Sequence, residues 1–291
     1  MIDELSRSGI DYDAFMAFRD DDRAFAYDDR DAILYALGAG MGRDPLDERE
    51  LRFVYEGEDF VAMPTLAVVV ARSGLARQLP INYAQVLHGE QSLTVHRPLP
   101  TAARLLADTR ITRILDKGAG KGALIYADTV ARLANTGEPL FTTGMTLFAR
   151  GDGGFGGTGE GAPAVHRMPD RAPDHVFVTQ TRRDQALLYR LSGDRNPLHA
   201  DPATAKRAGF PQPILHGLCT YAIACRAVLA SVADYRPERI RDFAVRFTSP
   251  VYPGDAIETD LWVDGGIVSF RCRVSDRAVT VIDNGRCVLA A

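Results

Sequence analysis

A weak internal repeat constrains the fold of this 291-residue chain more than any other feature of its sequence. Each half contains one tyrosine and two prolines that match in order and in short context: Tyr35 with Tyr189, Pro64 with Pro213, and Pro98 with Pro250. The second member of each pair follows the first by 154, 149 and 152 residues, respectively. A nearly constant offset indicates one structural unit that occurs twice, and the chain is long enough for two domains.

The two copies share one order of predicted elements. A short amphipathic helix around Tyr35 or Tyr189 is followed by a loop and a more apolar helix, at 63–70 or 214–232, which we expect to be buried. Alternating segments between turn signals then predict four strands in each copy, at 84–97, 103–115, 123–132, 140–150, 241–249, 256–264, 267–275 and 279–289. A buried helix followed by antiparallel strands is typical of an α+β unit whose sheet wraps around the helix. The sequence therefore predicts a double hotdog, that is, two tandem hotdog units.

A segment rich in glycine and proline, residues 151–173, separates the copies and shows no apolar periodicity. We interpret it as a linker between a first copy at 1–150 and a second copy at 174–291. The segment contains Gly151-x-Gly153-x-x-Gly156, which has the spacing of a dinucleotide-binding fingerprint. Residues 158–163 cannot open a helix and no βαβ unit follows, so the linker interpretation is preferred.

Composition and termini point to a reduced, cytoplasmic protein. The net charge of −4 gives no reason to expect a nucleic acid or a membrane surface as partner. The four cysteines form no C-x-x-C pair, so we expect buried thiols and neither a metal nor a cofactor. The N-terminus does not have the pattern of a signal peptide, and no apolar run is long enough to span a membrane. We interpret the acidic run Asp20-Asp21-Asp22 as a solvated loop.

The segment with the clearest chemistry follows the helix around Tyr189 and contains Asp194, Asn196 and His199. Pro197 stops that helix, so the three side chains lie on an irregular turn where they can converge. A carboxylate and an imidazole can share acid and base duties on a water molecule, and an amide can hold that water. A simple turn in which Asp and Asn bond their own backbone is the alternative.

The first copy offers a test of that alternative. Its corresponding segment, 43–47, reads Arg-Asp-Pro-Leu-Asp, so the turn is present where the imidazole is absent. A requirement for the turn alone does not explain His199. We expect the second copy to be active and the first to be degenerate.

A second candidate element is Gly217, at the start of the apolar helix of the second copy. The first turn of a helix has unpaired N–H groups and a partial positive charge, which suit a developing oxyanion. A residue without a side chain lets that oxygen approach, and one such donor is typically worth about 3–4 kcal/mol. We interpret the preceding His216 as a capping or core histidine.

Seven motifs together resemble the type 2 (MaoC-like) (R)-specific enoyl-CoA hydratases, including the hydratase 2 unit of peroxisomal multifunctional enzymes: YRLSGDRNPLH, AGFPQPILHGLCTY, RFTSPVYPGD, NYAQVLHGEQ, LPTA, LDKG and LFARGDGGFGG. The resemblance implies a double hotdog that adds water reversibly and syn to trans-2-enoyl-CoA, giving (3R)-3-hydroxyacyl-CoA. It further implies that Asp194 and His199 are the acid–base pair, that Asn196 positions the water, and that the N–H of Gly217 is the oxyanion donor.

The same resemblance implies a substrate-binding set for the acyl-CoA, made of His88, Gly89, Lys117 and Phe247. Hotdog units usually pair through their sheets, so a homodimer is expected. Two other functions stay open: a dehydratase or thioesterase that acts on an acyl-carrier-protein thioester, and an acyl-CoA-binding module without activity. The intact set of Asp194, Asn196 and His199 argues against the binding module.

Overall fold

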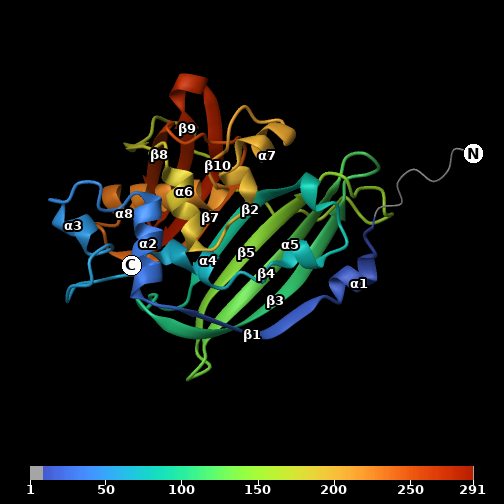
Figure 1. Cartoon of the computed structure of the whole chain (residues 1–291), viewed down its shortest axis with the longest axis horizontal. Helices are drawn as coiled ribbons and strands as arrows, with labels where there is room; N and C mark the ends of the chain where they lie inside the picture. The colour runs from blue at the N-terminus through green and yellow to red at the C-terminus, as the bar shows by residue number, and fades with distance from the viewer. Residues whose placement is uncertain (1–8, 291) are drawn as a thin grey trace, which may run out of the picture.

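The structure is a computed structural model and describes residues 9–290. Its main feature is one antiparallel sheet of ten strands in the order β1-β3-β4-β5-β2-β7-β10-β9-β8-β6 (Figure 1). The strands of the first copy are β1 (Arg19–Tyr27), β2 (Val86–Val95), β3 (Ala103–Asp116), β4 (Ala123–Leu133) and β5 (Pro139–Ala149). Those of the second are β6 (His175–Gln180), β7 (Ile240–Phe247), β8 (Ala256–Asp264), β9 (Ile267–Val274) and β10 (Val279–Leu289).

The strand order confirms the internal repeat. Within the first copy the order is β1-β3-β4-β5-β2, and within the second copy it is β6-β8-β9-β10-β7, so the two connectivities are identical. The copies join where β2 pairs with β7, from Glu90 opposite Arg246 to Thr94 opposite Asp242. The double hotdog and the eight predicted strands are therefore confirmed.

Strands β1 and β6 lie at the two edges of the sheet and were not predicted. The interpretation of Asp20-Asp21-Asp22 as a loop is wrong, because the run lies inside β1. Its charges face solvent, and the register with β3 shifts between Asp20 and Arg23, so no apolar alternation marks the strand. Edge strands often carry such charges and bulges.

The central helices of the two copies differ in length. In the second copy, α8 (Gly217–Ser231) is buried on most sides, as predicted for 214–232. In the first copy, a 3-10 turn (Pro64–Leu66) leads into α4 (Ala67–Val70), which is a single turn long. Its β-branched valines have lower helix propensity than the alanine-rich sequence of α8. The prediction located both helices and the end of the first at Val70, but the first half of that segment is a 3-10 turn.

The repeat tyrosines meet where the two copies pack together. Tyr35 lies on α2 (Asp29–Ala39) and Tyr189 on α6 (Gln185–Tyr189), and the two helices lie side by side (Figure 1). Both rings are fully buried, with centroids 5.8 Å apart. A Cβ on Gly38 would lie 3.1 Å from the ring of Tyr189, so the close approach of α2 to α6 requires a residue without a side chain.

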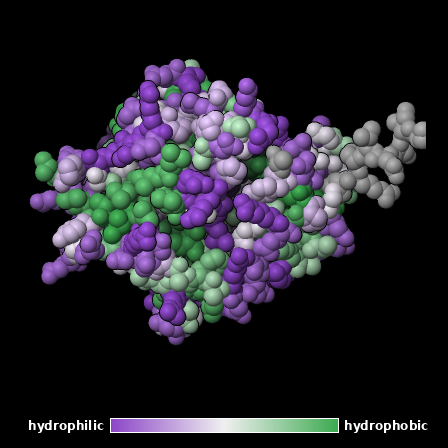
Figure 2. All heavy atoms as spheres, viewed as in Figure 1, coloured by the Kyte–Doolittle hydropathy of each residue, from purple (hydrophilic) through white to green (hydrophobic). Residues whose placement is uncertain are grey.

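The remaining helices are short and lie in the connections: α1 (Tyr12–Met16), α3 (Glu48–Leu51), α5 (Leu75–Gln78) and α7 (Pro202–Arg207). Among the described residues, no helix has the length and apolar character needed to cross a membrane. Figure 2 shows that hydrophilic residues cover most of one face and that a hydrophobic area lies on the side of α2 and α3. Of the residues that the structure describes, Leu46 is the most exposed large hydrophobic side chain, at 86%.

The glycine-rich segment between the copies wraps around a carboxylate. Asp116, at the end of β3, accepts hydrogen bonds from the N–H groups of Gly118, Gly154 and Gly156 at 2.8, 2.7 and 2.9 Å. Burial alone would raise the pKa of Asp116, but these donors outweigh it and lower the pKa. Gly156 of the fingerprint-like set and its neighbour Gly154 therefore bind an internal carboxylate, which agrees with the rejection of a phosphate-binding loop.

Candidate active site

The turn that carries Asp194 follows directly from helix α6. A 3-10 turn (Arg190–Ser192) continues that helix, and Gly193 ends it in the left-handed region with φ +111°. Pro197 then opens a further 3-10 turn (Pro197–His199). Because glycine adopts a positive φ at no steric cost and proline has its φ fixed, the sequence dictates this irregular path.

Asp194 and Asn196 hold the turn through local hydrogen bonds. The N–H of Asn196 donates to Oδ1 of Asp194 at 3.2 Å, and the N–H of Leu198 donates to Oδ1 of Asn196 at 3.1 Å. Asp194 and Asn196 therefore bond the backbone of their own turn, as the alternative interpretation predicted. Each side chain keeps further capacity, since a carboxylate has about four acceptor positions and an amide has two N–H donors.

His199 is held in one tautomer. Its Nδ1 lies 2.9 Å from the carbonyl oxygen of Ile214, and a carbonyl can only accept, so Nδ1 carries the proton. The neutral ring therefore presents an unprotonated Nε2. Burial lowers the pKa of His199, which keeps the imidazole neutral at neutral pH.

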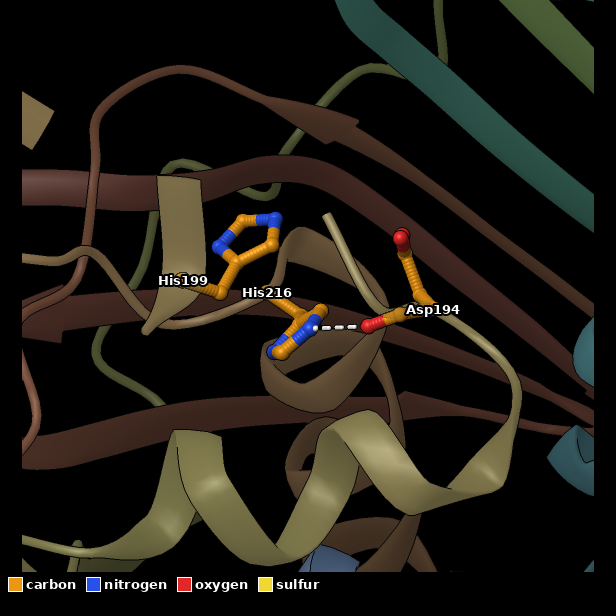
Figure 3. A group of neighbouring side chains, drawn as sticks. All are labelled: Asp194, His199 and His216. Carbon is orange, nitrogen blue, oxygen red and sulfur yellow. Dashed lines mark hydrogen bonds between the residues drawn. The ribbon is translucent and has the colours of Figure 1, made fainter. Parts of the chain in front are cut away.

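His216 supports this arrangement from below. Its ring stacks on that of His199, with centroids 3.7 Å apart, and its Nε2 donates to the backbone oxygen of Asp194 at 3.0 Å (Figure 3). Burial, followed by the neighbouring His199, lowers the pKa of His216 to about 3. His216 is a core histidine whose side chain does not cap α8. Its contacts with both His199 and the turn at Asp194 were not predicted from the sequence.

Arg72 of the first copy also reaches the turn and was not predicted. Its Nη1 lies 3.1 Å from Oδ2 of Asp194. Burial would raise the pKa of Asp194, but the charge of Arg72, assisted by His216 and the N–H of Asn196, lowers it. Asp194 is therefore ionised at neutral pH.

Gly217 is the first residue of α8, as the sequence predicted. The N–H groups of Cys219 and Thr220 both bond to the carbonyl of His216, so the N–H of Gly217 precedes the first intrahelical bond. A Cβ on Gly217 would lie 3.4 Å from the ring of Phe247. A larger residue would narrow the approach to this donor.

Two of the expected substrate-binding residues, Phe247 and His88, contact each other, and Phe247 lies next to Gly217. Phe247, at the end of β7, meets His88 of β2 edge-on, with ring centroids 5.1 Å apart. Burial, with a smaller contribution from Arg72, lowers the pKa of His88 to about 4. Gly89 lies at the register shift between His88 and Glu90, where β2 bulges.

Lys117 lies apart from this group. It is exposed on the turn between β3 and β4. The register places Val86, Ala149, Ala123 and Asp116 in line across four neighbouring strands. Lys117 is thus at the same end of the sheet as His88, roughly 14 Å away from β2 across three strand spacings.

The geometry of Asp194, His199 and His216 suits a water better than a metal ion. Their ligand-type atoms all lie within 4.8 Å of one another. The two imidazole planes are only 29° apart and stacked, so in-plane lone pairs cannot converge on one ion at about 2 Å. One water, however, can bridge an ionised carboxylate and a neutral Nε2 across such a gap.

Comparisons with known proteins cover both copies. Residues 25–151 match the MFE-2 hydratase 2 N-terminal domain, and residues 164–285 match the MaoC like domain. The chain is 42% identical over 272 residues to 3-hydroxyacyl-thioester dehydratase Y of Mycobacterium tuberculosis, covering 90% of this chain and 92% of that protein. It is 36% identical to the peroxisomal enoyl-CoA hydratase 2 of Arabidopsis thaliana, covering 95% of each. A MaoC-like dehydratase from Phytophthora capsici has a similar structure, with a TM-score of 0.86 and 33% identity over 97% of this chain and 98% of that one.

Proposed function

The chain belongs to the MaoC-like hydratase 2 family and is a hydratase, and from this premise we propose that it converts trans-2-enoyl-CoA reversibly to (3R)-3-hydroxyacyl-CoA by syn addition of water. One observation carries the proposal. The ionised Asp194 and the imidazole of His199, whose Nε2 is unprotonated, have ligand-type atoms within 4.8 Å of each other, next to His216 at the start of α8. The residues of 174–291 would carry the chemistry, and 1–150 would bind the acyl-CoA.

The proposed reaction divides the work among four groups. Asp194 and Asn196 hold the water, and Nε2 of His199 takes one of its protons as the hydroxyl adds to C3. Electrons move onto the thioester oxygen, which the N–H of Gly217 stabilises as an enolate. The imidazolium then returns the proton to C2 on the same face, so one water is added in total. The acid–base step would contribute about 10²–10⁴-fold in rate, and the oxyanion donor about 3–4 kcal/mol.

The substrate path follows from the same geometry. His88, Gly89 and Phe247 would line the way of the acyl thioester to Gly217. Lys117, exposed at the same end of the sheet, would meet a phosphate of CoA as a point charge. No cofactor takes part in this scheme.

The test is incubation of the protein with crotonyl-CoA and a longer trans-2-enoyl-CoA. Loss of the conjugated enoyl absorbance reports hydration, and an (R)-specific dehydrogenase then identifies the product. Formation of (3R)-hydroxyacyl-CoA, abolished in Asp194→Asn and His199→Gln, would support the proposal. Release of free CoA would instead assign the protein to the thioesterases.

A second candidate is dehydration of a 3-hydroxyacyl thioester carried by an acyl-carrier protein. The name of the Mycobacterium tuberculosis relative, a 3-hydroxyacyl-thioester dehydratase, motivates it. Activity on a carrier-bound thioester without activity on either CoA ester would favour this function.

A homodimer and a cytoplasmic location stay predictions. Light scattering on the purified protein tests the first. Localisation of the tagged full chain in its own cells tests the cytoplasmic location. The Arabidopsis relative is named as peroxisomal, so a peroxisomal location is the outcome to compare with it.

A further inference from the structure

The guanidinium of Arg72 brings a charge from the first copy into the catalytic turn of the second. Its Nη1 is 3.1 Å from Oδ2 of Asp194, and the side chains are 36% and 23% exposed. We propose that Arg72 is a positioning residue, which fixes the carboxylate of Asp194 through this ion pair and thereby makes the first copy part of the catalytic apparatus. This inference rests on the hydratase function proposed above.

The ion pair divides the two carboxylate oxygens of Asp194 between two donors. Oδ1 accepts from the N–H of Asn196, and Oδ2 faces Arg72. Rotation of the carboxylate about its Cβ–Cγ bond would break one of these contacts. Each oxygen still has an acceptor position for a water. Arg72 therefore restricts the orientation of the Asp194 carboxylate and still leaves it able to accept a hydrogen bond from the water.

The backbone that carries Arg72 is itself fixed. Helix α4 ends at Val70, and the chain turns through Gly74, whose φ is +68°. Next to Arg72, the carbonyl of Ser73 accepts from Nη1 of Arg23 and from Nε2 of Gln78, both at 2.7 Å. These hydrogen bonds fix the backbone after α4, and the side chain of Arg72 therefore extends from a fixed position of the chain.

One cation acts on every titratable group of the site. Arg72 lowers the pKa of Asp194, and it also lowers the pKa values of His199, His216 and His88. A guanidinium stays charged across the working range of pH, so Arg72 favours one ionised carboxylate beside neutral imidazoles. The charged or titratable groups that act on Asp194 or His199 are Arg72, His216, His199, His88, Arg77 and Arg190.

The test compares Arg72→Gln, which removes the charge, with Arg72→Lys, which keeps it. The matched control is Arg97→Gln: Arg97 also belongs to the first copy, but it pairs with Glu138 at 2.8 Å, and both side chains are about half exposed. Kinetics as a function of pH are measured with an enoyl-CoA that the wild-type protein hydrates. We expect Arg72→Gln to lower kcat about tenfold with little change in KM, less than loss of the acid–base pair itself.

The pH profile adds a readout that a purely structural role would not move. Without the charge of Arg72 the pKa values of Asp194 and His199 rise. The acidic limb of the pH–rate profile, where activity falls as these groups take up protons, should therefore move to higher pH. Arg72→Lys should restore most of the rate and the wild-type acidic limb, and Arg97→Gln should resemble wild type. A rise in KM alone, or equal effects of Arg72→Gln and Arg97→Gln, would overturn the inference.

A measurement without substrate separates this inference from the proposed function. The chain has six histidines, so imidazole signals can be assigned by substitution and titrated by NMR. In folded Arg72→Gln the pKa of His199 should be higher than in wild type. An unchanged His199 titration would refute the role of Arg72 even if the wild-type protein is an active hydratase. A shifted titration would support it even if no enoyl-CoA is hydrated.

Discussion

The turns that follow the repeat tyrosines have the same local shape in both copies but different uses. In the first copy the N–H of Leu46 donates to Asp44 at 2.9 Å, just as the N–H of Leu198 donates to Asn196 at 3.1 Å in the second. A proline lies between donor and acceptor in each case. The backbone of the turn is therefore specified twice, whereas the imidazole of His199 occurs once.

The turn of the first copy is used to join the two halves. Nη2 of Arg43 donates to Gln185 at 2.8 Å, and Glu50 pairs with Arg226 of α8 at 2.7 Å. The side chains of the Glu50–Arg226 pair are only 3% and 11% exposed. The same turn can thus carry the proposed catalytic residues in one copy and contribute to packing between the copies in the other.

Paired substitutions at the aligned positions Asp47 and His199 test this division most strongly. His199→Gln should lower kcat about 10²–10⁴-fold, because the proton acceptor is lost. Asp47→Gln removes the cap of α3 and an exposed ion pair with Arg49, which together cost about 1 kcal/mol of stability, and should leave kcat unchanged. Steady-state kinetics measure both, and a comparable loss of kcat in Asp47→Gln would contradict the comparison.

Glu50→Gln should expose the structural role of the first copy. The substitution leaves the buried guanidinium of Arg226 without its counter-charge, so the free energy of unfolding should fall by about 3 kcal/mol or more. Urea denaturation measures it, with Glu138→Gln as the control. Glu138 pairs with Arg97, and both side chains are about half exposed. Glu138→Gln should therefore lower the free energy of unfolding by less than about 1 kcal/mol. Equal losses would mean that the buried pair is not what joins the copies.

Acid sensitivity should come partly from His216. In the folded protein it stays neutral down to a pKa of about 3, whereas the unfolded chain binds the proton near the ordinary value of 6.5. The contribution of His216 to stability is therefore complete above 6.5 and is lost as the pH falls through this window. Denaturation at several pH values gives the free energy of unfolding as a function of pH. Below pH 6.5 this free energy should fall less steeply in His216→Leu than in wild type. A slope equal to that of wild type would show that other groups dominate.

The smallest effect is expected from the two turn-forming side chains themselves. Asp44→Ala and Asn196→Ala each remove one side-chain acceptor for a backbone N–H, at a cost of about 1 kcal/mol. Thermal denaturation should show similar losses for the two variants, while only Asn196→Ala should also lower kcat. Unequal losses of stability would show that the turns are not equivalent.

Local patterns in the sequence were enough for the architecture and for the catalytic turn. Alternation and turn residues located eight strands, and Gly193 and Pro197 impose the path that carries Asp194 to His199. The edge strands β1 and β6 could not be located in this way, since edge strands need not show a buried face.

The parts of the site that were missed depend on tertiary packing between separate segments. Arg72 and Asp194 are 122 positions apart, and no sequence spacing predicts that they form an ion pair. The stack of His216 on His199 likewise arises only when α8 packs beneath the turn. The assignment of Lys117 and the other substrate-binding positions stays a prediction.

The acidic run in β1 has a consequence for how this molecule behaves in a crowded solution. A ten-stranded sheet that is not closed leaves a free edge at each end, and such an edge can pair with a strand from a neighbouring molecule. On β1 an incoming strand would have to lie against five consecutive charged residues, 19–23, and across a bulge at Asp22. The cost of desolvating these charges and the broken register make that pairing unfavourable. The run thus works as a barrier to aggregation at the start of this edge strand.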